Sequence, residues 1–386
     1  VKYYPIMGLE IHAEMKTKTK MWCSCLNDAD ETEPNKNICP VCMAHPGTLP
    51  VPNKQAIQNV IKVGLACGST IADFTEFDRK NYFYPDIPKG YQLSQYKYPL
   101  VSGGALGGVA LTRIHLEEDT ATSTHDKDDN SLVNFNRAGV PLMELVTEPV
   151  IHDLETITKF AKELQLVLKY LDVSDADMEK GHMRIEVNVS VTPDPTKRSK
   201  SYVELKNINS FSAATAAAQY EINRMIELWS TGKETEIIKE TRGWDENKKI
   251  TVSQRNKENA EDYRYFPDPD LSKLYLHSDP DFNPDILIKS LGELPFARRE
   301  RYLGLGLKPE NTETFVTQKI YGDYFDSVFA NSTNKELAIL ISNYIGSDLV
   351  GMLKDKSDID VYLPSPEILR EMCQLILDET VTSRGA

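Results

Sequence analysis

The segment RIHLEED, residues 113–119, carries five ionisable side chains in seven positions. Strand alternation puts Glu117 on one face with Arg113, His115 and Asp119, so we prefer Glu117 to Glu118 as a member of their surface. The segments GLEIHAEMK, PLMELVTEP, MRIEVNVSV and SYVELKN also alternate between apolar and polar residues. Their polar positions add further acidic and imidazole side chains, namely Glu10, His12, Glu14, Glu144, Glu148, Glu186 and Glu204.

Carboxylates at this density on one open sheet face repel each other unless positive charge lies among them. Mg²⁺ is the expected partner, because it takes oxygen ligands, keeps several waters and bridges carboxylates to phosphate groups. A single imidazole is compatible with Mg²⁺ or Mn²⁺, and Arg113, Arg184 and Lys206 could hold phosphate oxygens. A solvated sheet face with ion pairs between strands explains the same spacing equally well, because period two does not identify neighbouring strands.

Four of the six cysteines lie in one short segment, as a CxC pair and a CxxC pair: Cys23, Cys25, Cys39 and Cys42. Two close pairs of thiolates across one loop predict a tetrahedral Zn²⁺ site with Zn–S distances of about 2.3 Å. A redox pair or buried free cysteines are the alternatives. Four thiolates leave no open coordination position, so the predicted zinc stabilises the fold. Cys67 and Cys373 occupy apolar helical positions and are expected to be core thiols.

The chain of 386 residues is too long for one simple core, and 40% of it is hydrophobic. No apolar run approaches the length of a membrane span and no export signal opens the chain, so we expect a soluble, intracellular protein. The net charge of −14 provides no overall attraction for nucleic acid. RNA contact would need local basic groups, such as Lys197, Arg198 and Lys200 or Arg298, Arg299 and Arg301, which ordinary surface charge explains equally well.

Helices are predicted at residues 53–68, 153–171 and 210–230, each after an Asn, Asp or Ser cap. Together with the alternating strands they predict an α+β domain, with an antiparallel sheet covered by helices on one face and open on the other. From about residue 294 the patterns are almost all helical. We therefore expect one domain over residues 1–290, with the zinc loop at 23–42, and an all-α domain over 291–386.

Two common catalytic motifs are missing from the sequence. It contains no GxxxxGK[ST] phosphate loop, so a nucleotide would be bound by the metal-bearing sheet face. It contains no GxSxG nucleophile, and the clustered cysteines are assigned to zinc, so this chain alone should not hydrolyse an amide. Residues 77–96, FDRKNYFYPDIPKGYQLSQY, are rich in aromatic residues and interrupted by proline, which predicts a long, ordered, functional loop.

Eight segments resemble, in order, the motifs of GatB, a subunit of the aspartyl/glutamyl-tRNA(Asn/Gln) amidotransferases. They are GLEIHAEMKTKTKMWC, CPVCMAHPGTLPVPNKQAI, FDRKNYFYPDIPKGYQLSQY, RIHLEED, NFNRAGVPLMELVTEP, MEKGHMRIEVNVS, ELKNINSF and DYRYFPDPDL. The resemblance is dense over about residues 1–275 and looser beyond. It implies a catalytic (cradle) domain related to glutamine synthetase, with ATP and metal on the open sheet face, followed by a helical domain.

Members of this family phosphorylate the side-chain carboxylate of Glu or Asp misacylated onto tRNA(Gln) or tRNA(Asn). Ammonia made by a separate amidase subunit (A) displaces the phosphate, and a small linker subunit (C) ties the two together. The resemblance therefore implies an ATP-dependent ligase of protein biosynthesis, within a heterotrimer. A prokaryotic cytoplasm is the expected compartment, with an organelle matrix as the alternative.

Motif position also implies site residues. The implied Mg²⁺ ligands are His12, Glu10, Glu117, Glu118 and Glu144. Three of them, His12, Glu117 and Glu144, are also the implied catalytic residues. The implied ATP contacts are Arg184, Lys80 and Arg113. Lys80 is explained equally well as an ordinary surface lysine.

The chain departs from the family pattern in two places. EKGHMRIEVNVS stands where many members have EEGSLRCDANVS, so the role of Glu186 is open. The C-terminal domain that grips tRNA in relatives does not follow residue 386, so weaker tRNA affinity is expected. Two other functions stay open: an ATP-dependent carboxylate–amine ligase acting on a free amino acid, and a non-catalytic, zinc-containing RNA-binding scaffold.

Overall fold

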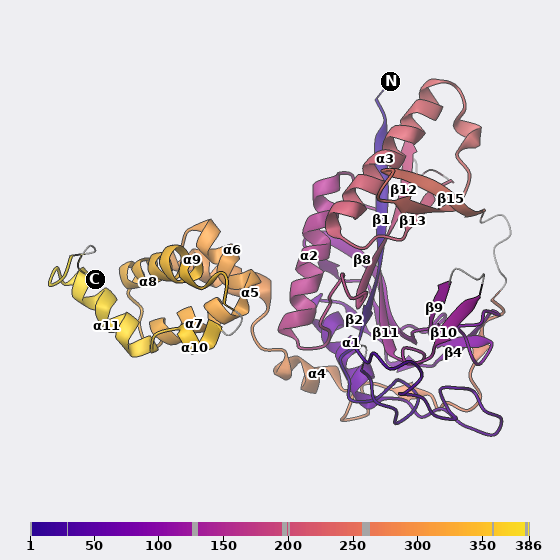
Figure 1. The fold of residues 1–386 in the computed structure, drawn as a ribbon, viewed down its shortest axis with the longest axis horizontal. Coiled ribbons are helices and arrows are strands. Elements are labelled where there is room, and N and C mark those ends of the chain that lie inside the picture. Colours follow the sequence, from indigo (N-terminus) through magenta and orange to yellow (C-terminus); the bar gives the residue numbers. More distant parts are fainter. Residues whose placement is uncertain are drawn as a thin grey trace. The chain divides into compact units, whose positions relative to one another are not determined.

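A computed structural model describes residues 2–28, 30–125, 130–194, 199, 201–256, 263–356, 359–382 and 385. The chain divides into two compact units, Val1–Gly292 and Glu293–Ala386 (Figure 1). The basic residues Lys197, Arg198 and Lys200 lie outside the described residues.

The first unit is built on a mixed sheet of ten strands, in the order β15-β14-β13-β12-β1-β11-β8-β6-β2 with β7 paired to β8. The strands are β1 (Tyr4–Glu14), β2 (Thr70–Ile71), β6 (Val101–Ser102), β7 (Ala105–Leu106), β8 (Val109–Glu118), β11 (Pro141–Thr147), β12 (Met183–Thr192), β13 (Val203–Lys206), β14 (Glu240–Asp245) and β15 (Ile250–Asn256). Among these described strands, β13 and β14 pair in parallel and the other pairs are antiparallel. The expected antiparallel sheet is thus wrong at this pair, because helix α3 (Phe211–Ser230) separates the two strands as a crossover.

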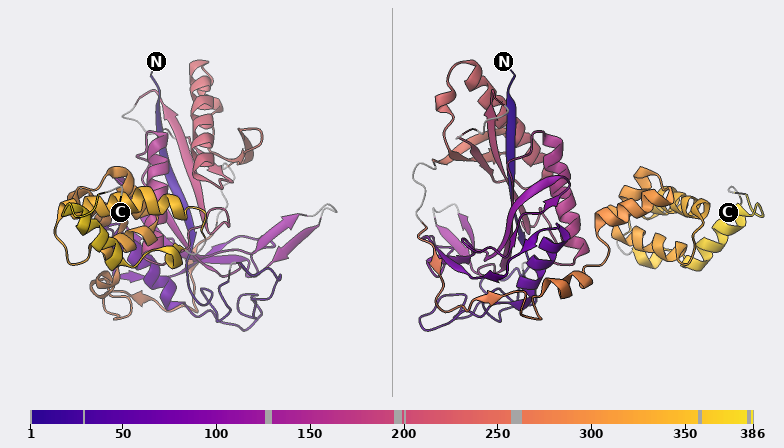
Figure 2. Two further views of the ribbon diagram at one scale, coloured as in Figure 1. Left: turned by 60° about the vertical axis from the view of Figure 1, so that its left-hand side comes forward. Right: turned by 180° about the vertical axis from the view of Figure 1, so that it is seen from behind.

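Helices α1 (Lys54–Ala66), α2 (Leu154–Tyr170) and α3 cover the sheet (Figures 1 and 2). Asn53, Asp153 and Ser210 cap them through side chains that accept hydrogen bonds from the first turn, which confirms the three predicted helix starts. The apolar positions of β1 and β12, such as Ile11 and Val187, are buried beneath these helices. The opposite face of the sheet carries the charged side chains.

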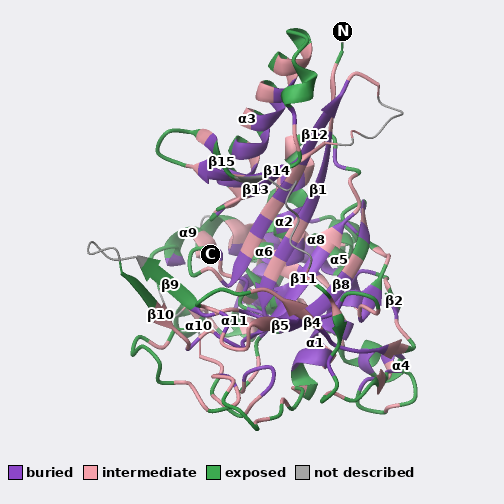
Figure 3. Ribbon diagram, turned by 90° about the vertical axis from the view of Figure 1, so that its right-hand side faces the viewer, coloured by how far each residue is buried: buried purple, intermediate pink, exposed green. Residues whose placement is uncertain are grey.

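Smaller sheets flank the main sheet. They are β4 (Asp78–Asn81) with β5 (Tyr91–Ser94) and β16 (Phe266–Pro267), β3 (Phe74–Thr75) with β17 (Leu274–Tyr275), and β9 (Thr122–His125) with β10 (Ser131–Asn134). The β9–β10 hairpin is largely exposed, whereas β11 is buried (Figure 3). The expectation of one long loop over 77–96 is therefore wrong near both ends of this segment, because residues 78–81 and 91–94 form the paired strands β4 and β5. Pro85 and Pro88 lie in the connection between β4 and β5, where they interrupt no strand pairing.

The second unit is all helical where it is described. It contains α5 (Pro295–Leu305), α6 (Pro309–Thr317), α7 (Lys319–Phe329), α8 (Lys335–Asn343), a π-helical turn (Tyr344–Leu349), α9 (Val350–Leu353), α10 (Ile359–Tyr362) and α11 (Pro366–Leu377), whereas the short α4 (Pro284–Leu287) belongs to the first unit. Its core includes the packed rings of Tyr302, Phe315 and Phe325. Every arginine of the predicted basic group, Arg298, Arg299 and Arg301, forms an ion pair within this unit.

One helical stretch of this unit, Lys335–Leu353, is long and apolar enough to cross a membrane by length and composition alone, with a mean hydropathy of 1.2. The expectation that no apolar run approaches a span is therefore wrong on these two measures. Leu337, Ile341 and Ile345 of this stretch are buried. Core helices of soluble proteins meet the same two measures, so the stretch carries no conclusion about a membrane.

We expect Gly64→Ala to destabilise the first unit, because helix α1 approaches β6 closely at this position. An added Cβ would lie 2.7 Å from a methyl carbon of Val101 and 3.1 Å from Ile71. Overpacking of this kind costs about 2 kcal/mol of unfolding free energy, measurable by urea denaturation. Gly304→Ala is the control, since the same methyl group meets no neighbour there on α5. It should leave stability unchanged or raise it slightly, and equal losses at both glycines would contradict the packing argument.

Candidate active site

Strand register brings acidic and imidazole residues into one row across the polar face of the sheet. His12 on β1 pairs with Glu144 on β11 and with Arg184 on β12. Glu144 in turn pairs with His115 on β8. These strands are neighbours in space although their residues are far apart in the chain.

Side-chain atoms in this row approach each other closely. The Nε2 atom of His12 lies 3.4 Å from Oε2 of Glu144 and 3.9 Å from carboxylate oxygens of Glu10 and Glu117. The Nε2 atom of His115 lies 3.5 Å from Glu144 and 3.7 Å from Glu117. Two sets of possible metal ligands result, Glu10–His12–Glu144 and His115–Glu117–Glu144, and they share Glu144. We call these five residues the carboxylate–histidine cluster.

His115, Glu117 and Glu144 are buried, whereas Glu10 and His12 are partly exposed, and charges within the cluster shift the pKa values of its members. Burial opposes the charge of His12, but its hydrogen bond to Glu144 and the nearby carboxylates raise its pKa to about 9. Burial also raises the pKa of Glu144, yet the charges of His115 and His12 hold it well below its usual range. Burial and the charge of Glu144 raise the pKa of Glu10 to about 7. The cluster thus holds carboxylates of unequal proton affinity, which is common at functional sites.

Three predicted phosphate contacts lie beside this cluster. Arg113 Nη2 lies 3.1 Å from Oε1 of Glu144. Lys80 is partly buried, which opposes its charge, but the charge of Glu117 is the largest influence that raises its pKa. Arg184 Nη2 lies 2.7 Å from Asp119 Oδ2, one position beyond the end of β8. All three cations therefore stand around the acidic row, each beside at least one carboxylate.

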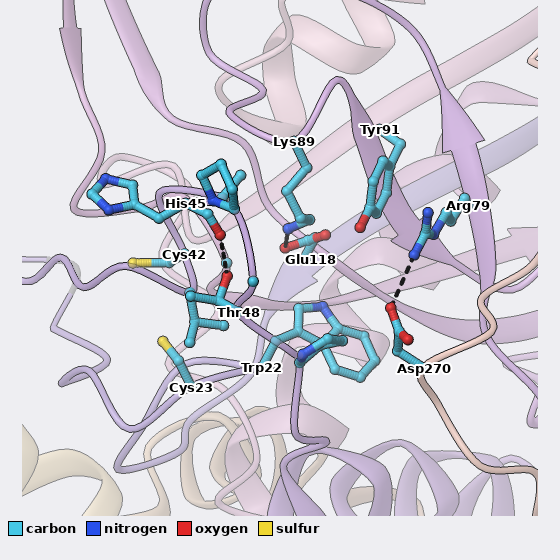
Figure 4. Close-up of a pocket in the computed structure, with 16 residues that line it drawn as sticks. Trp22, Cys23, Cys42, His45, Thr48, Arg79, Lys89, Tyr91, Glu118 and Asp270 are labelled. Atoms are coloured by element: carbon cyan, nitrogen blue, oxygen red, sulfur yellow. Dashed lines mark hydrogen bonds and ion pairs between the residues drawn. The ribbon is translucent and has the colours of Figure 1, made fainter.

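Glu118 does not join the cluster, because consecutive strand residues point to opposite faces. Its carboxylate accepts hydrogen bonds from Lys89 Nζ at 2.6 Å and from the Leu93 amide at 2.9 Å. It lines a separate cavity of about 260 Å³, in which Figure 4 shows it beside Lys89 and Tyr91. Of the two residues weighed from the sequence, the structure brings only Glu117 to His12.

Other members of the predicted polar face divide between the cluster and its surroundings. Glu186 and Glu204 extend the acidic row toward β13, and with Glu10 they form a third possible ligand set, in which Lys206 Nζ lies 2.7 Å from Glu186. Glu14 lies beside Asp119, and burial together with that charge raises its pKa to about 8. Glu148 accepts a hydrogen bond from Thr112 outside the cluster.

Sequence reasoning did not include His115 or Ser94 among the site residues. His115 shares the period-two face of Glu117, so strand alternation could have identified it. Ser94 Oγ donates a hydrogen bond of 2.9 Å to Glu117. Its contribution depends on the approach of β5 to β8, for which the sequence contains no local signal.

The four clustered cysteines also meet. Cys42 Sγ lies 4.0 Å from Cys25 Sγ and 3.9 Å from Cys39 Sγ, and ligand atoms of all four cysteines lie within 4.8 Å of one another. Thiolates around a tetrahedral ion with bonds of about 2.3 Å stand about 3.8 Å apart. A hydrogen bond from Cys23, partly opposed by burial, lowers the pKa of Cys42 to about 5. Cys67 and Cys373 are buried elsewhere, as predicted for core thiols.

A mixed sheet with this cluster on its polar face, a cysteine quartet in the same unit and a helical second unit define an α+β enzyme of two compact units. Residues 5–280 match the family model of the GatB/GatE catalytic domain. The chain belongs to this family, which confirms the resemblance seen in the sequence motifs.

Similar proteins cover nearly the whole chain. The GatB subunit of the aspartyl/glutamyl-tRNA(Asn/Gln) amidotransferase of Caldanaerobacter subterraneus subsp. tengcongensis is 40% identical, over 99% of this chain and 81% of its own length. The corresponding chloroplastic/mitochondrial subunit of the glutamyl-tRNA(Gln) amidotransferase of Ostreococcus lucimarinus is 41% identical, over 97% of this chain and 78% of its own length. That of Sorghum bicolor is 39% identical, over 98% and 70%. Bacterial and organellar proteins thus both resemble the chain.

In the metal-free chain, we expect the imidazole of His12 to titrate at about pH 9. Since this pKa lies above the unfolded value of 6.5, the stabilisation from His12 is fully present below pH 6.5 and disappears as pH rises through 9. Titration of the histidine ring signals by NMR measures it, with His12→Gln to assign the resonance. A His12 signal that titrates near the unfolded value would show that Glu144 does not hold its proton.

Proposed function

We propose that this chain is the ATP-dependent subunit of a tRNA-dependent amidotransferase. It phosphorylates and then amidates the side-chain carboxylate of Glu or Asp misacylated on tRNA(Gln) or tRNA(Asn). The convergence of His12, Glu117 and Glu144 with Lys80, in a chain about 40% identical to GatB subunits of amidotransferases, carries this proposal.

The chemistry suits the cluster. A carboxylate is a poor acyl donor, and phosphorylation turns one of its oxygens into a leaving group that ammonia can displace. Phosphoryl transfer depends mainly on positioning and charge neutralisation, and it needs no protein nucleophile. Bound Mg²⁺ would supply charge neutralisation at the transferring phosphoryl group.

The donor atoms of the cluster fit such an ion. Mg²⁺ takes oxygen ligands, and Glu10, Glu117 and Glu144 offer carboxylate oxygens beside His12, in sets whose atoms lie within 4.8 Å. Arg113, Arg184 and Lys80 are proposed to hold phosphate oxygens of ATP, because they bring positive charge to the same face. Glu118 is excluded from the proposed ligands, since its carboxylate binds Lys89 and Leu93.

Residues 1–290 are the proposed catalytic domain, and residues 291–386 are the proposed helical domain. A sheet covered by helices on one face, with ligands for nucleotide and metal on the other, supports a relation to glutamine synthetase. No step of amide hydrolysis is assigned to this chain. Ammonia is proposed to come from a partner amidase subunit (A), joined through a small linker subunit (C), in a bacterial cytoplasm or an organelle matrix.

The cysteine quartet is proposed to bind one structural Zn²⁺. Four sulfur atoms at tetrahedral spacing support zinc over a redox pair. The Cys39 amide nitrogen, 3.2 Å from Cys42 Sγ, donates a hydrogen bond that supports a charged sulfur. The ion would tie the loop of residues 23–42 to the segment just before β11, because Gly139 lies against Cys42. The Gly139 carbonyl also accepts a hydrogen bond from the Met21 amide, just before the loop.

Replacing Glu144 or Glu117 by Gln should lower amidation by roughly 100-fold or more, because each change removes a charged ligand from the buried cluster. Glu118→Gln is the matched control, since the neighbouring carboxylate faces away and should cost far less. The measurement is conversion of Glu-tRNA(Gln) by the assembled complex with ATP and glutamine. Equal losses of amidation activity in the Glu117 and Glu118 variants would contradict the assignment of Glu117 as a metal ligand. Conversion of free glutamate but not of Glu-tRNA(Gln) would favour a free amino acid ligase instead, and undiminished activity of the Glu144 variant would favour a scaffold.

Purified protein should contain about one zinc per chain. Cys39→Ser should lose the metal and expose residues 23–42 to protease, whereas Cys373→Ser, at a buried cysteine outside the quartet, should retain it. Elemental analysis and limited proteolysis measure these outcomes. Full zinc content after Cys39→Ser would place the metal elsewhere.

A further inference from the structure

Five tyrosine rings form a continuous row beside the carboxylate–histidine cluster, and we call them the tyrosine row: Tyr84, Tyr82, Tyr263, Tyr265 and Tyr96. Each ring contacts the next, with centroids 5.9, 5.8, 5.9 and 4.4 Å apart. The last two rings are stacked, with only 8° between their planes. Tyr84 and Tyr96, at the two ends, are 51% and 66% exposed.

The middle of the row adjoins the cluster. The Nζ atom of Lys80 lies 5.1 Å from the ring centre of Tyr263 and 5.7 Å from that of Tyr82. The charges of Glu117 and Glu144 also act on Lys80 and raise its pKa. A ligand lying along the tyrosines would therefore have its reactive end at the proposed metal ligands.

The backbone holds two distant segments together to build this row. The Asn81 side chain donates hydrogen bonds to the carbonyl oxygens of Tyr263 and Arg264, and the Asn81 amide bonds Tyr263 as well. Arg264 has a positive φ of 43°, a conformation that costs energy in a residue with a side chain. Such strain is typical of functional segments, and here it lies between two tyrosines of the row.

We propose that the tyrosine row is a stacking platform for the unpaired bases at the aminoacylated 3′ end of the RNA substrate. This inference rests on the proposed function. Proteins recognise single-stranded RNA ends chiefly by stacking bases on aromatic side chains, because every base has an aromatic face. The exposed rings of Tyr84 and Tyr96 offer those faces, and the row leads the esterified amino acid toward Glu117.

The arrangement of charge across the sheet separates this RNA end from the nucleotide. The tyrosine row adjoins β8 through β4 and β5, whereas the acidic set Glu10–Glu186–Glu204, with Lys206, extends the cluster in the opposite direction toward β13. A metal-bound triphosphate fits the cluster itself, where Arg113 lies beside Glu144 and Lys80 is influenced by the charge of Glu117, and bases fit the exposed rings at the ends of the tyrosine row. The carboxylate to be activated would then meet the phosphoryl donor at Glu117 and Glu144.

Tyr96→Ala tests the platform in the assembled complex. We expect the KM for Glu-tRNA(Gln) to rise roughly 10-fold, the usual loss when one stacking ring is removed, with the KM for ATP unchanged. Tyr96→Phe keeps the ring and should restore the wild-type KM. Tyr275→Ala is the matched control, because Tyr275 is 60% exposed but pairs with Phe74, outside the row. A rise in the KM for ATP, or equal effects of the Ala and Phe variants, would overturn the platform.

Binding separates failure of the platform from failure of the proposed function. An acceptor-stem minihelix without an attached amino acid should bind the wild-type complex more weakly when its unpaired 3′ bases are removed. In the Tyr96→Ala complex, the intact and shortened minihelices should bind with equal affinity. If amidation is absent but this coupling is present, the proposed function fails and the platform stands. If amidation proceeds and the coupling is absent, the platform fails. A Tyr96→Ala defect explained entirely by weaker assembly with the amidase partner would instead identify the row as a protein interface.

Discussion

Negative charge on the buried part of a sheet face has to be compensated within a few ångströms, and the site is organised around this constraint. Glu117 and Glu144 are only 3% and 6% exposed, so water cannot screen them well. Compensation in the metal-free chain comes from His12, His115 and nearby Lys80. A proton on His12, whose pKa is raised, occupies the role that a divalent cation would take, so metal and proton compete for the same carboxylates.

A row of hydrogen bonds between two sheets, which we call the seam, connects the cluster to the strands beside the tyrosine row. Strands β5 and β8 belong to different sheets, yet residues 92–94 of β5 and the following Gln95 each form a hydrogen bond with one of residues 116–118 of β8. Gln92 and Leu93 bond Glu118, Ser94 bonds Glu117, and Gln95 accepts the Leu116 amide. Since β4 pairs with β5, the same seam fixes Lys80. Alternation then separates the functions of neighbours: Lys80 and Glu117 face the cluster, whereas Arg79 and Glu118 line the cavity of Figure 4.

Local patterns predicted the parts of the molecule that depend on local physics. Caps at Asn53, Asp153 and Ser210 marked helix starts, and period two placed Glu117, His12 and Glu144 on polar faces. The parallel pairing of β13 with β14 was missed, because period two does not reveal strand direction or neighbours. Two prolines in residues 77–96 hid β4 and β5, which pair with each other, and the third strand of their sheet, β16, is distant in the sequence. The tyrosine row needs Tyr82 to meet Tyr263, about 180 positions away in the chain.

The net charge of −14 bears on how such a chain could hold RNA at all. Long-range electrostatics oppose a polyanion here, and the arginines of the helical unit, Arg298, Arg299 and Arg301, are already paired with carboxylates. Binding through phosphates would release counterions and weaken steeply with salt, whereas stacking on uncharged rings does not depend on released ions. The reactive end is also where an acidic cluster would most strongly repel phosphates. Aromatic contact can therefore hold the RNA end beside the acidic cluster. Additional basic residues could do so only by neutralising the carboxylates that the proposed metal requires.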